Sequence, residues 1–278
     1  MQYWVEPSFN SAYQKWCASR AIKPDIINIS SQTYGYWLGS SSSKAVLVFF
    51  HGMLPEHIEP ARLQLTSTGG GFAFPANSGH LSFLSSIKDS MEAQGLSLSV
   101  LIVDYPLTPL TTFPTQFQEA VNAVRYVLET CGFEPSQIII GGDSAGGNLA
   151  AAVVLHCVQP SDLVAPLAAV SSASRFRGLV LLSPWVSFDV TLQSFTKPPG
   201  KDYIQAASEK AWSDSYLNES GPCIYSEPGL ASATQWKDIP VQDILVTAGA
   251  DELLLDGITK WVDDIKVLSS HSSLNIVA

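Results

Sequence analysis

Ile138-Ile139-Ile140-Gly141-Gly142-Asp143-Ser144-Ala145-Gly146-Gly147-Asn148-Leu149-Ala150 is the stretch that decides the fold of this chain. Three isoleucines indicate a buried strand, and the alanine-rich end indicates a helix. Between them lies a G-x-S-x-G pattern, which belongs to a sharp strand-to-helix turn that exposes a nucleophilic serine. Gly142 and Gly146 would let strand and helix approach closely, while Ser144 stands above the sheet. The backbone N–H of Ala145, at the start of the helix, is placed to stabilise an oxyanion.

The rest of the chain alternates short apolar runs with longer helical stretches. This rhythm predicts one α/β domain over residues 1–278, with a mostly parallel central sheet and helices on both faces. The expected strands are 45–50, 98–103, 137–140, 178–182, 243–247 and 274–277. The expected helices are 79–94, 113–131, 145–158 and 253–268.

Two regions depart from this rhythm and are predicted to form a small helical cap. They are residues 1–30 and residues 186–238, the second of which is rich in Pro, Gly, Ser and aromatic side chains. Open α/β sheets bind their ligands at the carboxyl ends of the strands, so we expect the cap there.

Composition excludes several function classes. The formal net charge is −10 and basic residues form no run, so nucleic acid and anionic membranes are poor partners. The N-terminus does not resemble a signal peptide and no apolar run is long enough to span a bilayer, which favours a cytoplasmic location. The scattered cysteines form no CxxC pair, so we expect no metal, disulfide or redox site. The expected partner is a small molecule, and the sequence leaves the oligomeric state open.

The motif Gly-Asp-Ser-Ala-Gly-Gly-Asn-Leu-Ala resembles the hormone-sensitive-lipase-like branch of the α/β-hydrolases, a group of carboxylesterases and lipases. Three further stretches are similar to that family: Asp104-Tyr105-Pro106-Leu107-Thr108-Pro109, Ser183-Pro184-Trp185 and Gly249-Ala250-Asp251-Glu252. The resemblance implies that Asp251 orients the catalytic histidine. Asp251 also directly follows an expected strand, which places it at the same sheet edge as Ser144. Asp256 is the competitor, but it falls in the next helix, where we expect it to face solvent.

The resemblance implies a His-Gly-Gly-Gly-Phe loop after the strand at 45–50, and this loop is split. The chain reads His51-Gly52, then residues 53–68, then Gly69-Gly70-Gly71-Phe72. The resemblance makes the N–H groups of Gly70 and Gly71, together with Ala145, the oxyanion donors, whereas His51 braces the loop. Removing residues 53–69 would restore the family pattern, and their codons can spell splice signals. We therefore hypothesise a retained intron of fungal type. The alternative is that Gly69–Gly71 forms only a flexible loop.

The third element of the site is the base. In this fold the order along the chain is Ser, Asp, His, and His271 is the only histidine after Asp251. His271 precedes the expected strand 274–277, so on a parallel sheet it enters from the edge opposite Ser144 and is a weak candidate. We expect the base beyond Ala278. Loss of a triad member costs about a million-fold in kcat, so the printed chain is expected to be nearly inactive.

These observations predict a serine carboxylesterase for a small, largely apolar ester, without metal or organic cofactor. If the source is a fungus, as the intron hypothesis suggests, secondary metabolism is a plausible setting. One alternative is a non-catalytic small-molecule-binding protein like the plant gibberellin receptor, which resembles the same branch. Another is a degenerate, truncated hydrolase.

Overall fold

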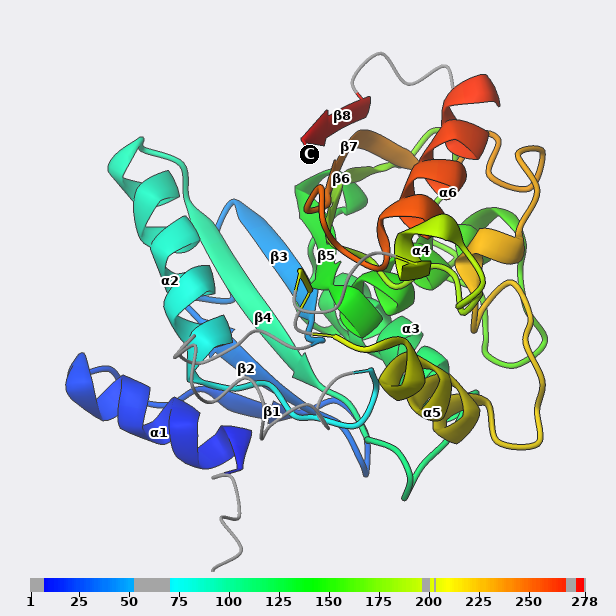
Figure 1. Ribbon diagram of the computed structural model, residues 1–278. Coiled ribbons are helices and arrows are strands. Elements are labelled where there is room, and N and C mark those ends of the chain that lie inside the picture. Colours follow the sequence, from blue (N-terminus) through cyan, green and yellow to red (C-terminus); the bar gives the residue numbers. More distant parts are fainter. Residues whose placement is uncertain (1–7, 53–70, 197–200, 203, 269–273, 278) are drawn as a thin grey trace, which may run out of the picture.

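The central feature of the computed structural model is one eight-stranded sheet, with strand order β1-β2-β4-β3-β5-β6-β7-β8 (Figure 1). The structure describes residues 8–52, 71–196, 201–202, 204–268 and 274–277. The strands are β1 (Ile26–Asn28), β2 (Tyr34–Leu38), β3 (Ala45–Phe50), β4 (Leu98–Asp104), β5 (Ile138–Asp143), β6 (Phe176–Leu182), β7 (Val241–Thr247) and β8 (Leu274–Val277). From β4 to β8 all neighbouring strands are parallel, and β1 and β2 add an antiparallel edge. The predicted mostly parallel α/β sheet is confirmed.

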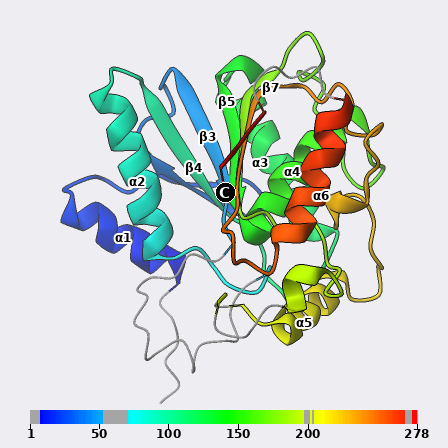
Figure 2. The same ribbon diagram turned by 45° about the horizontal axis from the view of Figure 1, so that its top comes forward.

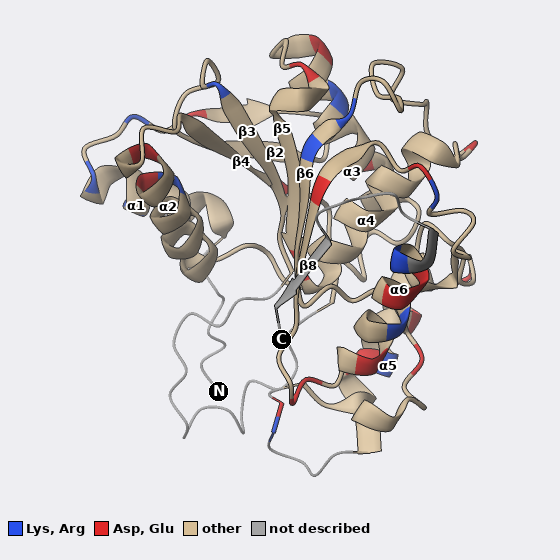
Figure 3. Cartoon of the chain, turned by 90° about the horizontal axis from the view of Figure 1, so that it is seen from above, with Lys and Arg blue, Asp and Glu red and all other residues tan. Residues whose placement is uncertain are grey.

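Helices cover both faces of the sheet, as Figure 3 shows with the sheet between them. One layer holds α1 (Phe9–Ser19) and α2 (Ser78–Ala93). The other holds α3 (Thr115–Arg125), α4 (Ser144–Val158) and α6 (Leu255–Leu268), and a π-helical turn, η1 (Tyr126–Thr130), continues α3. Three short 3₁₀ turns complete the described helices: η2 (Pro135–Gln137), η3 (Gln193–Thr196) and η4 (Pro228–Leu230).

Helix α5 (Ala206–Leu217) lies apart from both layers (Figure 2). It belongs to the region 186–238 that the sequence predicts as cap. The N–H of Phe113, in the loop after β4, donates to the carbonyl of Tyr216 in α5 at 2.8 Å. This contact holds α5 against loops at the carboxyl ends of the strands.

The N-terminal segment divides between a helix and the sheet edge. Residues 1–30 are predicted as cap, yet Ile26–Asn28 forms the edge strand β1. In α1, Phe9 and Tyr13 pack edge-on against Tyr36 of β2, and the Tyr13 hydroxyl donates to the carbonyl of Trp37 at 2.6 Å. Hydrophobic burial therefore holds α1 against the sheet.

Helix α4 lies at the centre of the molecule. Every residue from Ala145 to His156 is buried. A run of Gly and Ala lets the helix axis come close to the sheet, and β5 continues directly into α4. A β-carbon on Gly146 would lie 1.9 Å from the carbonyl oxygen of Phe50, and one on Gly142 would lie 2.4 Å from the Gly146 carbonyl carbon. The turn from β5 into α4 passes the end of β3 at a chain crossing that thus excludes side chains at both positions.

None of the described helices is long and apolar enough to cross a lipid bilayer. The cysteines, Cys17, Cys131, Cys157 and Cys223, are all free thiols.

A substitution at the chain crossing should be severely destabilising. Gly146→Ala would place a methyl group into backbone atoms of β3, so we expect a loss of about 3 kcal/mol or more, or roughly 10 °C in Tm. Gly178→Ala in β6 is the matched control, because its β-carbon would find no atom nearer than 3.5 Å. Thermal unfolding of the two variants measures the difference, and equal Tm values would contradict this account of the crossing.

The free energy of unfolding should depend on pH because of Glu209 in helix α5. This side chain is 2% exposed, and neither of its carboxylate oxygens has a hydrogen-bond partner among the described residues. Burial, helped by the negative charge of Asp202, raises the pKa of Glu209 from 4.5 to about 8. The folded protein therefore keeps a proton there that the unfolded chain releases, and stability falls as pH rises from 4.5 through 8.

We expect Glu209→Gln to raise the stability at about pH 8.5 by on the order of 2 kcal/mol, and to change it little at about pH 5. Denaturation curves at the two pH values measure the effect. Glu219→Gln, at an exposed position just after α5, is the control and should change neither. The same gain for Glu209→Gln at both pH values would show that its proton is not linked to folding.

Candidate active site

Ser144 occupies the first position of α4, directly after β5, and its backbone is strained. Its φ is +48°, in the left-handed region that residues other than glycine rarely adopt. The side chain is partly exposed, although its neighbours Asp143 and Ala145 are buried. The Ser144 carbonyl accepts a hydrogen bond from the N–H of Trp185 at 2.9 Å. Strain at a partly exposed serine is the geometry that a nucleophile in a strand-to-helix turn requires.

Asp143 ties the end of β3 to this turn. The carboxylate is buried, and its Oδ1 accepts the N–H of Gly52 at 2.8 Å and lies 3.3 Å from Nε2 of His80. A β-carbon on Gly52 would lie 2.8 Å from Cβ of Ser144, so the His51-Gly52 segment runs directly beside the nucleophile. The sequence assigns Asp143 no role; its only signal is its position in front of Ser144.

His51 is a structural brace in this arrangement. It is fully buried and stacks on Tyr105 with a ring-centroid distance of 4.4 Å. The Tyr105 hydroxyl donates to the His51 carbonyl at 2.6 Å. Burial lowers the pKa of His51 to about 3, with a smaller effect from His80, so the imidazole is neutral near pH 7. Burial also raises the pKa of Asp104, whose Oδ1 lies 3.9 Å from His51, to about 6.

Two of the three predicted oxyanion donors fall within the described chain. Ala145 is fully buried in the first turn of α4, where backbone N–H groups have no partner within the helix. Gly71 has a φ of +63°, and a β-carbon there would lie 2.8 Å from Cβ of Trp212 and 3.2 Å from Cζ3 of Trp185. Gly70 and the suspected insertion 53–69 lie outside the described residues. The donor assignment therefore stays a prediction.

The loop after β7 carries the predicted acid. Asp251 is exposed, and its Oδ2 forms an ion pair with Nζ of Lys201 at 3.2 Å. Its neighbour Glu252 is only partly exposed and accepts a hydrogen bond from Oγ of Ser183 at 2.6 Å. Asp256, expected to face solvent, is instead partly buried and accepts the N–H of Ser194 at 2.7 Å. His271 lies outside the described residues.

An aromatic cluster adjoins Trp185, next to the nucleophile. Phe72 stacks on Tyr216 of α5 with a centroid distance of 3.6 Å, and Trp185 packs against Phe188 at 4.6 Å. Trp212, also in α5, meets the Trp185 ring edge-on at 6.4 Å. Residues predicted as cap therefore contribute apolar surface beside the Trp185 segment, which is hydrogen-bonded to Ser144.

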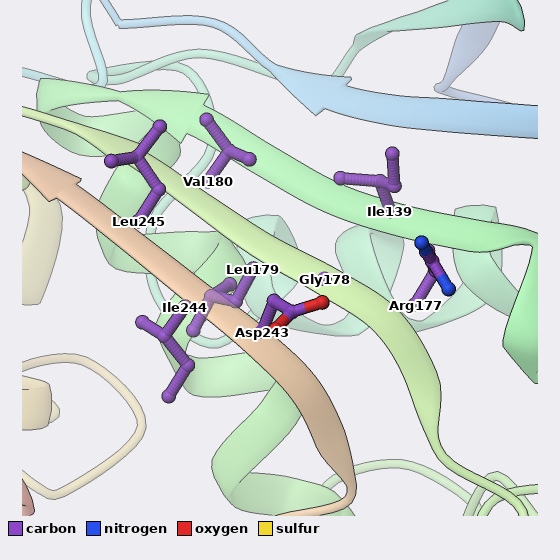
Figure 4. Close-up of a pocket in the computed structure, with 8 residues that line it drawn as sticks. All are labelled: Ile139, Arg177, Gly178, Leu179, Val180, Asp243, Ile244 and Leu245. Atoms are coloured by element: carbon purple, nitrogen blue, oxygen red, sulfur yellow. The ribbon is translucent and has the colours of Figure 1, made fainter. Parts of the chain in front are cut away.

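A hollow of about 250 Å³ lies along strands β5, β6 and β7, away from Ser144 (Figure 4). It is lined mainly by aliphatic side chains such as Ile139, Val180 and Leu245, with Arg177 and Asp243 as its charged groups. Its lining includes no Ser, Cys or His side chain, and Ile139 lies near the amino end of β5, whereas Ser144 follows its carboxyl end. Within the described part of the chain no group of His, Cys, Asp and Glu side chains could hold a metal ion. The Ser144 region is therefore the candidate active site.

Two curated proteins are similar in sequence to parts of this chain. Arylacetamide deacetylase of Mus musculus is 36% identical over 100 residues, which cover 34% of this chain and 24% of that protein. Steryl acetyl hydrolase 1 of Saccharomyces cerevisiae is 24% identical over 231 residues, covering 74% of this chain and 49% of that protein. The chain thus spans between a quarter and a half of the length of these two curated relatives.

A solved structure shows the same fold. The crystal structure of an esterase from the bacterial hormone-sensitive lipase family is similar with a TM-score of 0.69 and 24% identity, covering 98% of this chain and 82% of that chain. The family model described as α/β hydrolase fold matches residues 67–266, which include the strained turn, the aromatic cluster and the loop after β7. Because this match covers most of the sequence, the chain belongs to the α/β-hydrolase-fold family.

Proposed function

We propose that this protein is a serine carboxylic-ester hydrolase. The observation that carries the proposal is Ser144, a partly exposed serine at φ +48° in the first turn of the buried helix α4. Backbone strain of this kind costs about 1–3 kcal/mol and persists chiefly where function needs it. The names of the relatives, a deacetylase and an acetyl hydrolase, support the same reaction class.

In the proposed mechanism Oγ of Ser144 attacks the carbonyl carbon of the ester. The resulting oxyanion is stabilised by the N–H of Ala145 together with Gly70 and Gly71. A histidine takes the proton from Oγ and returns it to the departing alkoxide, leaving an acyl-enzyme that water hydrolyses. His271 is the weak candidate for this histidine. The carboxylate that orients it belongs to the loop after β7, where the sequence favours Asp251.

The substrate is proposed to be a small, largely apolar ester. Trp185, Phe188 and Trp212 supply aromatic surface beside the nucleophile, and the acetyl groups in the names of the relatives suggest a short acyl chain. A cytoplasmic location and a role in fungal secondary metabolism remain part of the proposal.

The second candidate function is ligand binding without turnover. It is favoured by the state of the described histidines near the turn. His51 and His80 are both fully buried, His51 stacks on Tyr105, and His80 lies against Asp143, so neither is free to act as base.

Replacing the nucleophile tests the proposed function. We expect Ser144→Ala to abolish any hydrolysis of p-nitrophenyl acetate that the parent shows above the uncatalysed rate, because the attacking oxygen is lost. Ser172→Ala, an exposed serine in the loop before β6, is the control and should retain full activity. Hydrolysis by Ser144→Ala at the rate of the parent would contradict the proposal. Saturable binding of ester analogues without turnover in any of these proteins would favour the second candidate.

Asp143 should position the loop that begins at Gly52. Asp143→Ala leaves the Gly52 N–H without its acceptor, which costs about 1–3 kcal/mol and loosens the segment beside Ser144. We expect faster hydrogen exchange at the Gly52 amide and a fall in kcat with little change in KM. Asp143→Asn keeps an acceptor oxygen and should restore most of the amide protection. If Gly52 exchanges equally slowly in all three proteins, Asp143 does not hold this segment.

A further inference from the structure

Helix α5 carries a buried acid on the side that faces the protein. Glu209, Ser213 and Tyr216 are its buried residues, and their spacing places them along one side of the helix. Glu209 is 2% exposed, and neither of its carboxylate oxygens has a hydrogen-bond partner among the described residues. A buried carboxylate without a donor is costly to maintain. The inner side of α5 therefore offers two acceptor oxygens to a donor from outside these residues.

A second acid, Asp202, lies close to Glu209. Its negative charge adds to the effect of burial in raising the pKa of Glu209. The Asp202 carboxylate is held in place by two backbone N–H groups, that of Ile204 at 3.0 Å and that of Leu253 at 2.8 Å. The segment before α5 is thus attached to the loop after β7, and it brings negative charge to Glu209 instead of a counter-ion.

The neighbouring lysines do not neutralise this charge. Lys201 and Lys210 are the described lysines nearest to Glu209 along the chain, and each forms an ion pair with another acid: Lys201 with Asp251, and Lys210 with Asp214. Neither lysine offsets the effects that raise the pKa of Glu209. A positive partner for Glu209 therefore has to come from outside the described part of the chain.

Trp212 gives the buried acid an aromatic neighbour. It follows Glu209 by three residues on α5, and β-carbons at this spacing on a helix lie about 5–6 Å apart. Side chains on a helix lean towards its N-terminus, which brings the Trp212 indole over the turn that carries Glu209. The Trp212 side chain is partly exposed, so a ligand can reach it from solvent. The face of an indole ring attracts cations.

The same tryptophan adjoins the candidate active site. A β-carbon on Gly71, a predicted oxyanion donor, would lie 2.8 Å from Cβ of Trp212. The Trp212 ring also meets Trp185 edge-on at 6.4 Å, and the N–H of Trp185 donates to the carbonyl of Ser144. A group bound between Trp212 and Glu209 would thus belong to a ligand of the Ser144 region.

We propose that α5 forms a subsite for a primary alkylammonium group, with Glu209 as its counter-ion and Trp212 as its aromatic wall. The N–H groups of the ammonium donate to the two carboxylate oxygens, and the indole face stabilises the positive charge. A neutral alcohol of the same shape lacks the charge and binds less tightly. That the amine-bearing ligand is an ester rests on the proposed function, whereas binding of the ammonium does not.

Calorimetry with the full chain tests the subsite without requiring turnover. At about pH 8.5 we expect 2-phenylethylammonium to bind at least about tenfold more tightly than 2-phenylethanol, its neutral counterpart. Glu209→Gln should remove this difference. Glu219→Gln, at an exposed position after α5, is the matched control for general attraction by the net charge of −10 and should keep it. Equal affinities for the two ligands in the parent, or a difference that persists in Glu209→Gln, would overturn the inference.

The affinity should also follow the ionisation of Glu209. Burial raises the pKa of Glu209 to about 8, so at about pH 6.5 the carboxyl group keeps its proton and the ammonium loses its counter-ion. Binding of 2-phenylethylammonium should then be weaker by about tenfold or more than at about pH 8.5, while binding of 2-phenylethanol stays unchanged. An ammonium affinity that is equal at the two pH values would reject the role of Glu209.

Inhibition of hydrolysis separates the subsite from the proposed function. If the parent hydrolyses p-nitrophenyl acetate, 2-phenylethylammonium should raise KM without changing kcat, and Glu209→Gln should abolish this competition. If the parent shows no Ser144-dependent turnover, the esterase proposal fails, and the calorimetric comparison still decides whether the subsite exists. Binding of the ammonium without competition in an active parent would overturn its placement beside the candidate active site.

Discussion

The architecture of the site depends on one steric constraint, the passage of the first turn of α4 across the end of β3. A β-carbon on Gly146 would lie 1.9 Å from the Phe50 carbonyl oxygen, so the backbones of these two segments are in direct contact. This approach leaves a single residue to reverse direction between β5 and α4, and that residue is Ser144, at φ +48°. The same approach brings the Asp143 carboxylate to the N–H of Gly52. Nucleophile and neighbouring loop are thus positioned by one contact.

Most of the central sheet was predictable because its signals are local. Apolar runs such as 45–50 and 98–104 are buried on both faces, and the helices between them have clear lengths and breaks. The edge strands β1 and β2 were missed. Tyr34–Leu38 contains two tyrosines, a tryptophan and a glycine and shows no alternation of polar and apolar residues. Position 35 has no room for a side chain, because Leu101 and Ile27 pack against Gly35 and a β-carbon would lie 2.7 Å from Cδ1 of Leu101. Only the folded sheet reveals this contact.

The candidate site also combines residues that the sequence predicts with contacts that it does not predict. Ser144 and Ala145 follow from a motif that dictates its own backbone. The hydrogen bond between Ser183 and Glu252 joins residues 69 positions apart, and neither local sequence predicts it. The family resemblance names Asp251 as the acid, whereas only the folded loop shows that Asp251 is exposed and that Glu252 accepts a hydrogen bond from Ser183. Gly70 and His271 lie outside the described residues, so their roles rest on sequence alone.

The antiparallel edge that the sequence missed also affects how the protein behaves at high concentration. A free sheet edge exposes a row of backbone donors and acceptors that can recruit a strand from another molecule. Here β1 consists of three residues, Ile26–Asn28, and is followed closely by the turn into β2. So short a border presents few unpaired groups, and on this side of the sheet edge-to-edge association between molecules is discouraged.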